Sequence, residues 1–205
     1  MKITVIDYGL SNLLSVRRAF EYFGAEVEVT GSRSRILSAK ALVLPGVGAF
    51  KDGMAGLSGL SLADAIADKC AVGTPLLGIC LGMQMLGRRS EEGPGEGLGY
   101  LPFDLKRFRL QDQPELKVPH MGWDYVTVER PQDPLVAGLE AEPRFYFVHS
   151  YHAVCDDPAD VLMTCDYGYP FPAAVGRGNV WGTQFHPEKS HRFGMCLIRN
   201  FVKEA

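Results

Sequence analysis

The stretch that decides the fold is residues 74–86, TPLLGICLGMQML. Its first four residues form an apolar run that predicts a buried strand, and residues 83–86 predict the beginning of a helix. Between them, Cys80 has a glycine two positions away on either side. Such a tight strand-to-helix turn is typical of a nucleophile elbow, with Cys in the place of Ser. Because a helix N-terminus favours thiolate over thiol, we predict that Cys80 is a nucleophile. A small buried cysteine on a tight turn is the alternative.

The first half of the chain alternates strand and helix patterns. We expect strands at 2–6, 25–29 and 41–44, a helix at 13–23 and a second helix within 52–69. Ser11 is the expected N-cap of the first helix, and Gly24 is its expected stop. Strands separated by helices form right-handed crossovers, so this half predicts a mainly parallel sheet.

The second half predicts short strands close together, at 118–128, 145–154, 161–165, 173–176 and 180–184. This spacing favours antiparallel additions to the sheet. Residues 91–99 are rich in glycine and predict a surface loop, and a helix at about 190–203 closes the chain. We therefore expect an α/β fold in which a mainly parallel sheet, flanked by helices, carries antiparallel additions in the C-terminal half. The whole chain, 1–205, is expected to be one domain.

Composition narrows the possible functions. At 46% hydrophobic and 22% charged residues, the chain can bury a full core, and a net charge of −3 predicts no nucleic-acid partner. No apolar run reaches the roughly 18–20 residues of a membrane span, and the chain starts with a strand pattern instead of a signal peptide. The five cysteines are odd in number and include no Cys-x-x-Cys pair, so we expect the protein to work in the reducing cytoplasm. Without a phosphate-binding or dinucleotide motif, we expect no cofactor.

A cysteine nucleophile needs a base, and the base needs an orienting group. His186 follows a strand-like run and precedes Pro187 and Glu188. Because proline turns the chain, the imidazole and the carboxylate can share one rim, where Glu188 would fix the tautomer of His186. Taken apart, they are an ordinary strand-end histidine and a surface acid. Together with the elbow they predict a Cys-His-Glu triad.

Two other features bear on the kind of site. The pair His149-x-x-His152 has the spacing of metal ligands, but no thiol cluster or second acid accompanies it, so we expect no metal site. An acyl-transfer site also needs oxyanion donors, and the N–H of Leu81 is the first candidate. The loop 45–48, PGVG, directly after a strand, is the second, although a plain turn would have the same sequence.

The three motifs PGVG at 45–48, GICLGMQ at 78–84 and QFHPE at 184–188, in this order, resemble the class I glutamine amidotransferases. The resemblance covers the whole chain. It implies a glutaminase that releases ammonia from glutamine through a γ-glutamyl thioester. The roles it implies are Cys80 as nucleophile, His186 as base and acid, Glu188 as orienter, Val47, Gly48 and Leu81 as the oxyanion hole, and Gln84, Ser150 and Tyr151 as glutamine contacts.

Within this family the chain is most similar to subunits that supply ammonia to a separate synthase. Val47 stands where several relatives have a third glycine, and the segments 117–123, KVPHMGW, and 145–151, FYFVHSY, match one branch, which acts in histidine biosynthesis. The glutaminase motifs fill the chain, so the ammonia acceptor must lie on another protein. The resemblance implies a heterodimer with a cyclase of (β/α)8-barrel form, contacted by Asn12, Trp123, Tyr146 and Lys189. For the two aromatic residues, simple core packing is the alternative.

Val47 also predicts a switch. A β-branched residue resists positive φ, so the loop can rest with a carbonyl, and not an N–H, facing the oxyanion position. Flipping one peptide would supply the donor, and the resemblance implies that the cyclase with its ligand bound drives this activation. The alternative is that Val47 only packs the loop against the core.

Two rival functions remain open from the sequence. The first is the same chemistry for another synthase, of pyridoxal phosphate or anthranilate, which Val47 and the segment 119–123 disfavour. The second is a DJ-1-like protein with a redox-sensing or chaperone role, which predicts no glutaminase activity. The motif His186-Pro187-Glu188 argues against this second rival.

Overall fold

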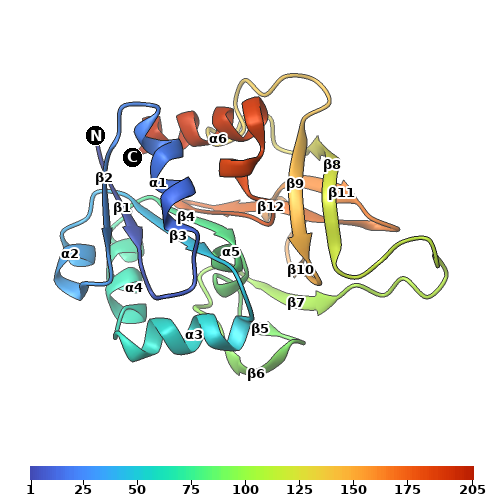
Figure 1. Cartoon of the computed structure of the whole chain (residues 1–205), viewed down its shortest axis with the longest axis horizontal. Helices are drawn as coiled ribbons and strands as arrows, with labels where there is room; N and C mark the ends of the chain where they lie inside the picture. Colours follow the sequence, from blue (N-terminus) through green and yellow to red (C-terminus); the bar gives the residue numbers. More distant parts are fainter.

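The computed structural model describes all residues, 1–205. Nine strands form the larger of two sheets (Figure 1): β1 (Lys2–Ile6), β2 (Glu26–Thr30), β3 (Leu42–Gly46), β4 (Leu76–Cys80), β8 (His120–Val128), β9 (Arg144–His149), β11 (Val161–Asp166), β12 (Pro170–Arg177) and β13 (Val180–Thr183). Their order is β2-β1-β3-β4-β13-β12-β11-β8-β9. The smaller sheet contains β5 (Arg89–Ser90), β6 (Gly93–Glu96), β7 (Phe103–Arg107) and β10 (Tyr151–Cys155), in the order β10-β7-β5-β6.

Helices cover both faces of the parallel strands (Figure 1). They are α1 (Leu13–Glu21), α2 (Arg33–Leu37), α3 (Phe50–Gly59), α4 (Ala63–Ala71), α5 (Leu81–Met85) and α6 (His191–Glu204), with short 3₁₀ turns η1 (Pro158–Asp160) and η2 (Pro187–Lys189). On one face α1 packs against α6, where the rings of Phe20 and Phe201 lie 6.0 Å apart. The other helices contribute to a second core on the opposite face. No helix combines the length and apolar character that a bilayer crossing needs.

The predicted division of the sheet is confirmed except at β13, which was expected among the antiparallel additions but pairs in parallel with β4. Strands β2, β1, β3, β4 and β13 pair in parallel, and β12, β11, β8 and β9 continue the sheet in antiparallel fashion. The parallel pairing of β4 with β13 matters most for function. Its register sets Ile79 opposite Thr183, so Cys80 and the chain leading to His186 leave neighbouring strands at the same end of the sheet.

Several expectations for the first half need correction. The helix expected within 52–69 is two helices, α3 and α4, because the chain turns at Ser61, which has a φ of 52°. The N-cap of α1 is Asn12 and not Ser11, since the Asn12 side chain accepts the N–H of Ser15. Strand β3 continues through Pro45, because its pairing with β1 already ends at Val43 and no ladder hydrogen bond is lost there. The short helix α2 was not predicted.

The second half differs more. The segment 91–99 is not a plain loop, since β6 and β5 form a hairpin in the smaller sheet. The strand expected at 145–154 is two strands, because the chain bends at Ser150 and passes from the larger sheet (β9) to the smaller one (β10). Strand β7, which joins the smaller sheet, was not predicted.

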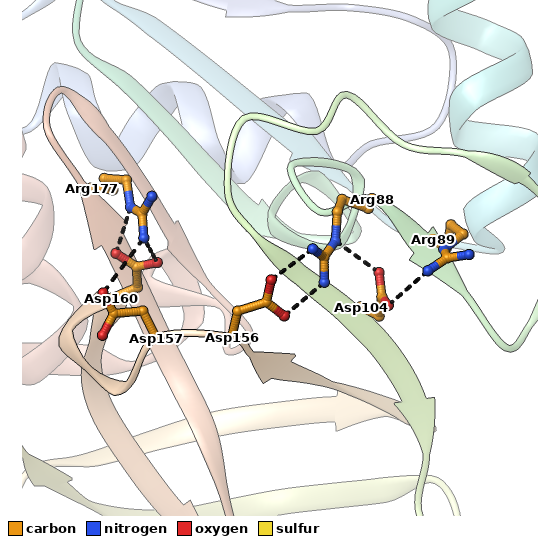
Figure 2. A network of polar contacts seen from close by, with 7 residues as sticks. All are labelled: Arg88, Arg89, Asp104, Asp156, Asp157, Asp160 and Arg177. Atoms are coloured by element: carbon orange, nitrogen blue, oxygen red, sulfur yellow. Dashed lines mark hydrogen bonds and ion pairs between the residues drawn. The ribbon is translucent and has the colours of Figure 1, made fainter.

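Arginines and aspartates form two neighbouring groups of ion pairs at the surface, which together we call the arginine–aspartate network (Figure 2). Arg88 donates two hydrogen bonds to the carboxylate of Asp156, of 2.7 and 2.8 Å, and a third to Asp104. Arg177, on β12, makes a second bidentate ion pair, with the carboxylate of Asp160, through hydrogen bonds of 2.8 and 2.7 Å. Each guanidinium therefore has a matched carboxylate, in the geometry that arginine prefers.

Candidate active site

Cys80 lies at the turn between β4 and α5, and its backbone has the strained geometry of a nucleophile elbow. Its φ is 54° and its ψ is −109°, a conformation that non-glycine residues rarely adopt. A side chain at Gly82 would collide with the carbonyl oxygen of Leu44, and one at Gly78 would lie 2.8 Å from the backbone of Gly82. The two flanking glycines are thus required by close backbone approach.

His186 and Glu188 meet beyond the end of β13. The Nδ1 atom of His186 lies 2.8 Å from Oε1 of Glu188, and both side chains are almost fully buried. The carboxylate therefore holds the proton of the ring on Nδ1 and leaves Nε2 available for chemistry. Burial would lower the pKa of His186, but the nearby Cys80 thiol and the hydrogen-bonded Glu188 carboxylate outweigh that effect and raise the pKa to about 9.

Both Nε2 of His186 and Oε2 of Glu188 are buried without a hydrogen-bond partner. Buried polar atoms are normally paired, and exceptions mark catalytic or strained sites. An orphaned base nitrogen beside a thiol has the arrangement needed to accept the proton of that thiol.

A pocket of about 300 Å³ opens above the elbow. Every residue predicted for the oxyanion hole and for glutamine binding lines it: Val47, Gly48, Leu81, Gln84, Ser150 and Tyr151, together with Cys80 and His186. Pro119, Val148, His149 and Glu92 complete the wall. Glu92 was not predicted as a site residue, because it lies in the segment that was expected to be a plain surface loop.

In the predicted oxyanion loop, 45–48, one N–H is already bonded. The N–H of Val47 donates to the carbonyl of Leu10 at 2.9 Å, so it is not available to an oxyanion at Cys80. Gly48 has a φ of 109°, a conformation that favours glycine. Val47 is 40% exposed, which argues against the alternative in which it only packs the loop against the core.

Two glutamines connect the pocket to the nucleophile. The Gln84 side chain donates to the Tyr151 carbonyl at 3.2 Å and to Oε1 of Gln184 at 3.1 Å. The amide of Gln184 in turn lies 4.0 Å from the sulfur of Cys80. Gln184 belongs to the QFHPE motif but had no predicted role. Its place beside the sulfur depends on the pairing of β13 with β4, which no local pattern encodes.

Three of the four predicted partner residues form one cluster. Trp123 and Tyr146 face each other across the β8–β9 ladder, with ring centroids 6.0 Å apart, and Lys189 lies over the Tyr146 ring. The Tyr146 carbonyl also accepts the N–H of His186, at 3.0 Å, which joins this cluster to the triad. Asn12 is exposed and caps α1.

The histidine pair 149 and 152 is held by other groups. His149 bonds to His120 and to the Tyr151 carbonyl, while His152 bonds to the hydroxyl of Tyr169. No group of three or more His, Cys, Asp or Glu side chains is positioned to hold a metal ion.

Comparison with known proteins decides the family. The family model described as glutamine amidotransferase class-I matches residues 4–205. The chain belongs to the class I glutamine amidotransferases. This amidotransferase is 48% identical to imidazole glycerol phosphate synthase subunit HisH 2 of Pseudomonas aeruginosa, over 98% of each chain. It is 44% identical to the protein of the same name from Methanococcus maripaludis, over 99% of this chain and all of the relative.

Solved structures show that the amidotransferase shares its fold with more distant proteins. The PurLQS structure from Thermotoga maritima contains a chain that matches with a TM-score of 0.78 at 21% identity, over 99% of this chain and 97% of that one. A protein from Thermoplasma acidophilum described as part of a putative GMP synthase matches with a TM-score of 0.74 at 22% identity, over 99% and 92%. At these identities the likeness concerns the fold alone.

Proposed function

We propose that this chain is the glutaminase subunit of an imidazole glycerol phosphate synthase. It hydrolyses glutamine to glutamate and ammonia and passes the ammonia to a partner cyclase, which makes imidazole glycerol phosphate and an aminoimidazole carboxamide ribonucleotide in histidine biosynthesis. The observation that carries this proposal is the meeting of Cys80 and His186 at one pocket, with Glu188 bonded to His186, in a chain whose full-length relatives bear that subunit name.

The triad geometry supports a two-step acyl transfer. His186 Nε2 takes the thiol proton, and the Cys80 thiolate attacks the γ-carbonyl carbon of glutamine. The oxyanion that forms is held by backbone N–H groups, among them that of Leu81. The imidazolium of His186 then protonates the leaving amine, so ammonia departs and a thioester remains. In the second step His186 deprotonates a water molecule, which attacks the thioester and releases glutamate and the thiol.

The pocket wall matches the polar groups of glutamine. Gln84, Ser150 and Tyr151 offer amide, hydroxyl and backbone groups for the substrate. Glu92 adds a carboxylate that suits an α-ammonium group. Its Oε2 accepts the N–H of Phe50 at 2.6 Å, so the carboxylate is held at the beginning of α3. We assign Glu92 to the ammonium end of the substrate.

The partner is proposed to be a cyclase of (β/α)8-barrel form that meets the cluster of Trp123, Tyr146 and Lys189, with Asn12 at the edge. The whole chain, 1–205, acts as one glutaminase domain. All five cysteines are free, which supports work in the reducing cytoplasm.

The resting loop supports partner-dependent activation. While the Val47 N–H donates to Leu10, one oxyanion donor is missing, and loss of such a donor lowers kcat by about 10²–10³. Rotation of one peptide would break the bond to Leu10 and turn an N–H toward Cys80. A partner that favours the rotated form would therefore switch the glutaminase on.

The test compares glutamine hydrolysis by the isolated chain, by the complex with the cyclase, and by the complex with the nucleotide substrate of the cyclase. We expect low turnover alone and a large rise in the last state. A chain that hydrolyses no glutamine in any state would exclude the glutaminase function. Equal turnover in all three states would exclude only the switch. Activation by another synthase, and not by the cyclase, would show that the chain serves another pathway.

A further inference from the structure

Beside the glutamine pocket lies a row of polar side chains that the triad chemistry does not use. Asp124 Oδ2 lies 2.6 Å from His120 Nε2, and His120 Nδ1 lies 3.1 Å from His149 Nε2. His149 Nδ1 lies 2.8 Å from the Tyr151 carbonyl oxygen. The row therefore runs from a partly exposed carboxylate to the wall of the pocket.

Strand pairing builds this row. His120, the first residue of β8, is paired with His149, the last residue of β9, in the antiparallel register. Asp124 lies four residues after His120 on the same strand and so projects to the same face. The rings are enclosed by aromatic side chains. Tyr167 stacks on His120 with centroids 4.0 Å apart, and Phe147 and Phe108 pack beside both histidines.

We propose that Asp124, His120 and His149 form a positioning relay for the glutamine pocket. The Tyr151 carbonyl accepts hydrogen bonds from both His149 and Gln84. It lies where the chain bends at Ser150 from one sheet into the other, so these bonds fix the corner of the pocket wall. Through Gln84 and Gln184 the same chain of bonds reaches the sulfur of Cys80. This inference rests on the proposed glutaminase function.

The relay has a definite proton count. Its three contacts, Asp124 to His120, His120 to His149, and His149 to a carbonyl, each need one proton to be hydrogen bonds. Two neutral imidazoles and a carboxylate bring only two protons. The carbonyl can only accept, so His149 carries its proton on Nδ1 and presents a bare Nε2. Without a third proton, one contact is left with two facing lone pairs, and the relay is complete only when a third proton is shared by His120 and Asp124.

The surroundings decide when that third proton binds. Burial lowers the pKa of His149 to about 3, so His149 stays neutral. Burial also lowers the pKa of His120 below its ordinary value of 6.5, although the hydrogen bond and charge of Asp124 oppose that effect. The other titratable groups that face the relay are Tyr167, stacked on His120, Cys165 near Asp124, and His152 and His186 near His149.

The relay should therefore be more complete at low pH than at high pH. Because the pKa of His120 is lowered in the folded protein, the complete relay exists in acid and loses one contact as the pH rises through that pKa. The substitution Asp124→Asn removes the need for a third proton, because the amide N–H can donate to the bare Nε2 of neutral His120. This variant therefore has a complete relay at every pH at which the protein is folded.

The experiment measures kcat/KM for glutamine in the activated complex with its cyclase. His120→Phe keeps a ring in the core but leaves Nε2 of His149 without a donor, and we expect a loss of about 5- to 100-fold, the effect of one buried polar atom left unpaired. The matched control is His152→Phe. His152 belongs to the same aromatic cluster and also makes two hydrogen bonds, but it lies outside the relay. We expect the control to keep its activity.

The conservative variant and a spectroscopic readout complete the test. The ratio of parent to Asp124→Asn activity should fall as the pH rises toward 6.5, the ordinary pKa of histidine, because only the parent loses a contact. The pH effects that both proteins share cancel in this ratio. Nitrogen NMR of the histidine-labelled chain should show neutral His149 with its proton on Nδ1. Equal losses in the two Phe variants, a constant ratio, or a His149 proton on Nε2 would overturn the relay. A parent complex without glutaminase activity would refute the proposed function instead, and the NMR spectrum would still decide the relay.

Discussion

The arginine–aspartate network of Figure 2 and the proposed glutamine pocket are both rich in polar groups, but the polar groups of the network have partners and several in and near the pocket do not. In the network Arg88 and Arg177 each face a carboxylate in two-bond geometry, and the side chains of Arg88 and Asp156 are 39% and 54% exposed. The buried side-chain atoms that have no partner are Tyr8 Oη, Ser11 Oγ, His186 Nε2 and Glu188 Oε2. Two belong to the proposed triad, and two lie in the segment around Leu10, whose carbonyl accepts the Val47 N–H of the proposed oxyanion loop.

This difference indicates that substitutions near the pocket should affect activity more than substitutions in the network. Exposed ion pairs are screened by water and salt, so each contributes little to stability. A buried atom without a partner is unfavourable in the resting state and gains most when a substrate or a rearranged loop supplies the missing partner. Substitutions in the two regions should therefore have effects that differ by orders of magnitude.

The largest effect is expected at Cys80. Cys80→Ala removes the nucleophile and should abolish glutamine-dependent product formation, while ammonia-dependent synthesis by the complex survives because the acceptor site lies on the partner. Cys196→Ala is the control, since that thiol lies in α6 outside the pocket and should be dispensable. Glutaminase activity that persists in Cys80→Ala would refute the assignment.

The second largest effect is expected at Glu188, the proposed orienting carboxylate. Glu188→Gln keeps the shape but allows the wrong tautomer of His186, and by analogy with other triads kcat should fall by up to about 10⁴-fold with little change in KM. Steady-state kinetics of the activated complex measure both constants. A near-parental kcat would show that Glu188 is not needed to orient the base.

The third prediction concerns the pKa of His186. With its pKa raised to about 9, His186 should titrate by NMR far above the ordinary value of 6.5, and Cys80→Ala should move the midpoint down. A raised pKa stabilises the folded protein below the unfolded value, and that stability is lost as the pH rises through 9. The free energy of unfolding should therefore decline between pH 6.5 and 9 more steeply in the parent than in Cys80→Ala. Equal slopes would contradict the coupling.

A smaller effect is expected at the oxyanion loop. Val47→Gly removes the β-branched side chain that disfavours positive φ, so the peptide should rotate more freely. We expect the basal glutaminase of the isolated chain to rise by about tenfold, within the 10²–10³ that one oxyanion donor supplies. The activation ratio of the complex should shrink accordingly. A variant that matches the parent in every state would argue against a switch at this peptide.

The smallest effect belongs to the surface network. Arg88→Ala breaks the ion pairs to Asp156 and Asp104, yet we expect it to lower the free energy of unfolding only slightly, because water and salt screen these groups. Glutaminase kinetics should stay unchanged. Denaturant unfolding with and without added salt measures the contribution, and a loss of activity would mean that the network reaches the pocket.

The sequence could predict features that depend on neighbouring residues, but not those that depend on contacts between distant parts of the chain. The elbow at Cys80 and the motif at His186 are local patterns, and the elbow's two glycines report a steric need that any βα turn of this kind has. The pairing of His120 with His149 depends on the register of two strands 29 residues apart. The bend at Ser150 and the carboxylate of Glu92 likewise depend on a second sheet, whose short strands carry almost no periodic signal.

The packing of glycines around β3 has a consequence for how activation can be observed. A side chain at Gly46 would collide with the hydroxyl of Tyr8, and one at Gly82 with the backbone of Leu44. The strand that carries the oxyanion loop is thus wedged between its neighbours and cannot slide. A planar peptide can still rotate as a unit while its two Cα atoms stay in place. Activation by this route would leave the outline and the Cα trace of the enzyme unchanged, so it would escape scattering experiments and be seen only by probes of individual amides.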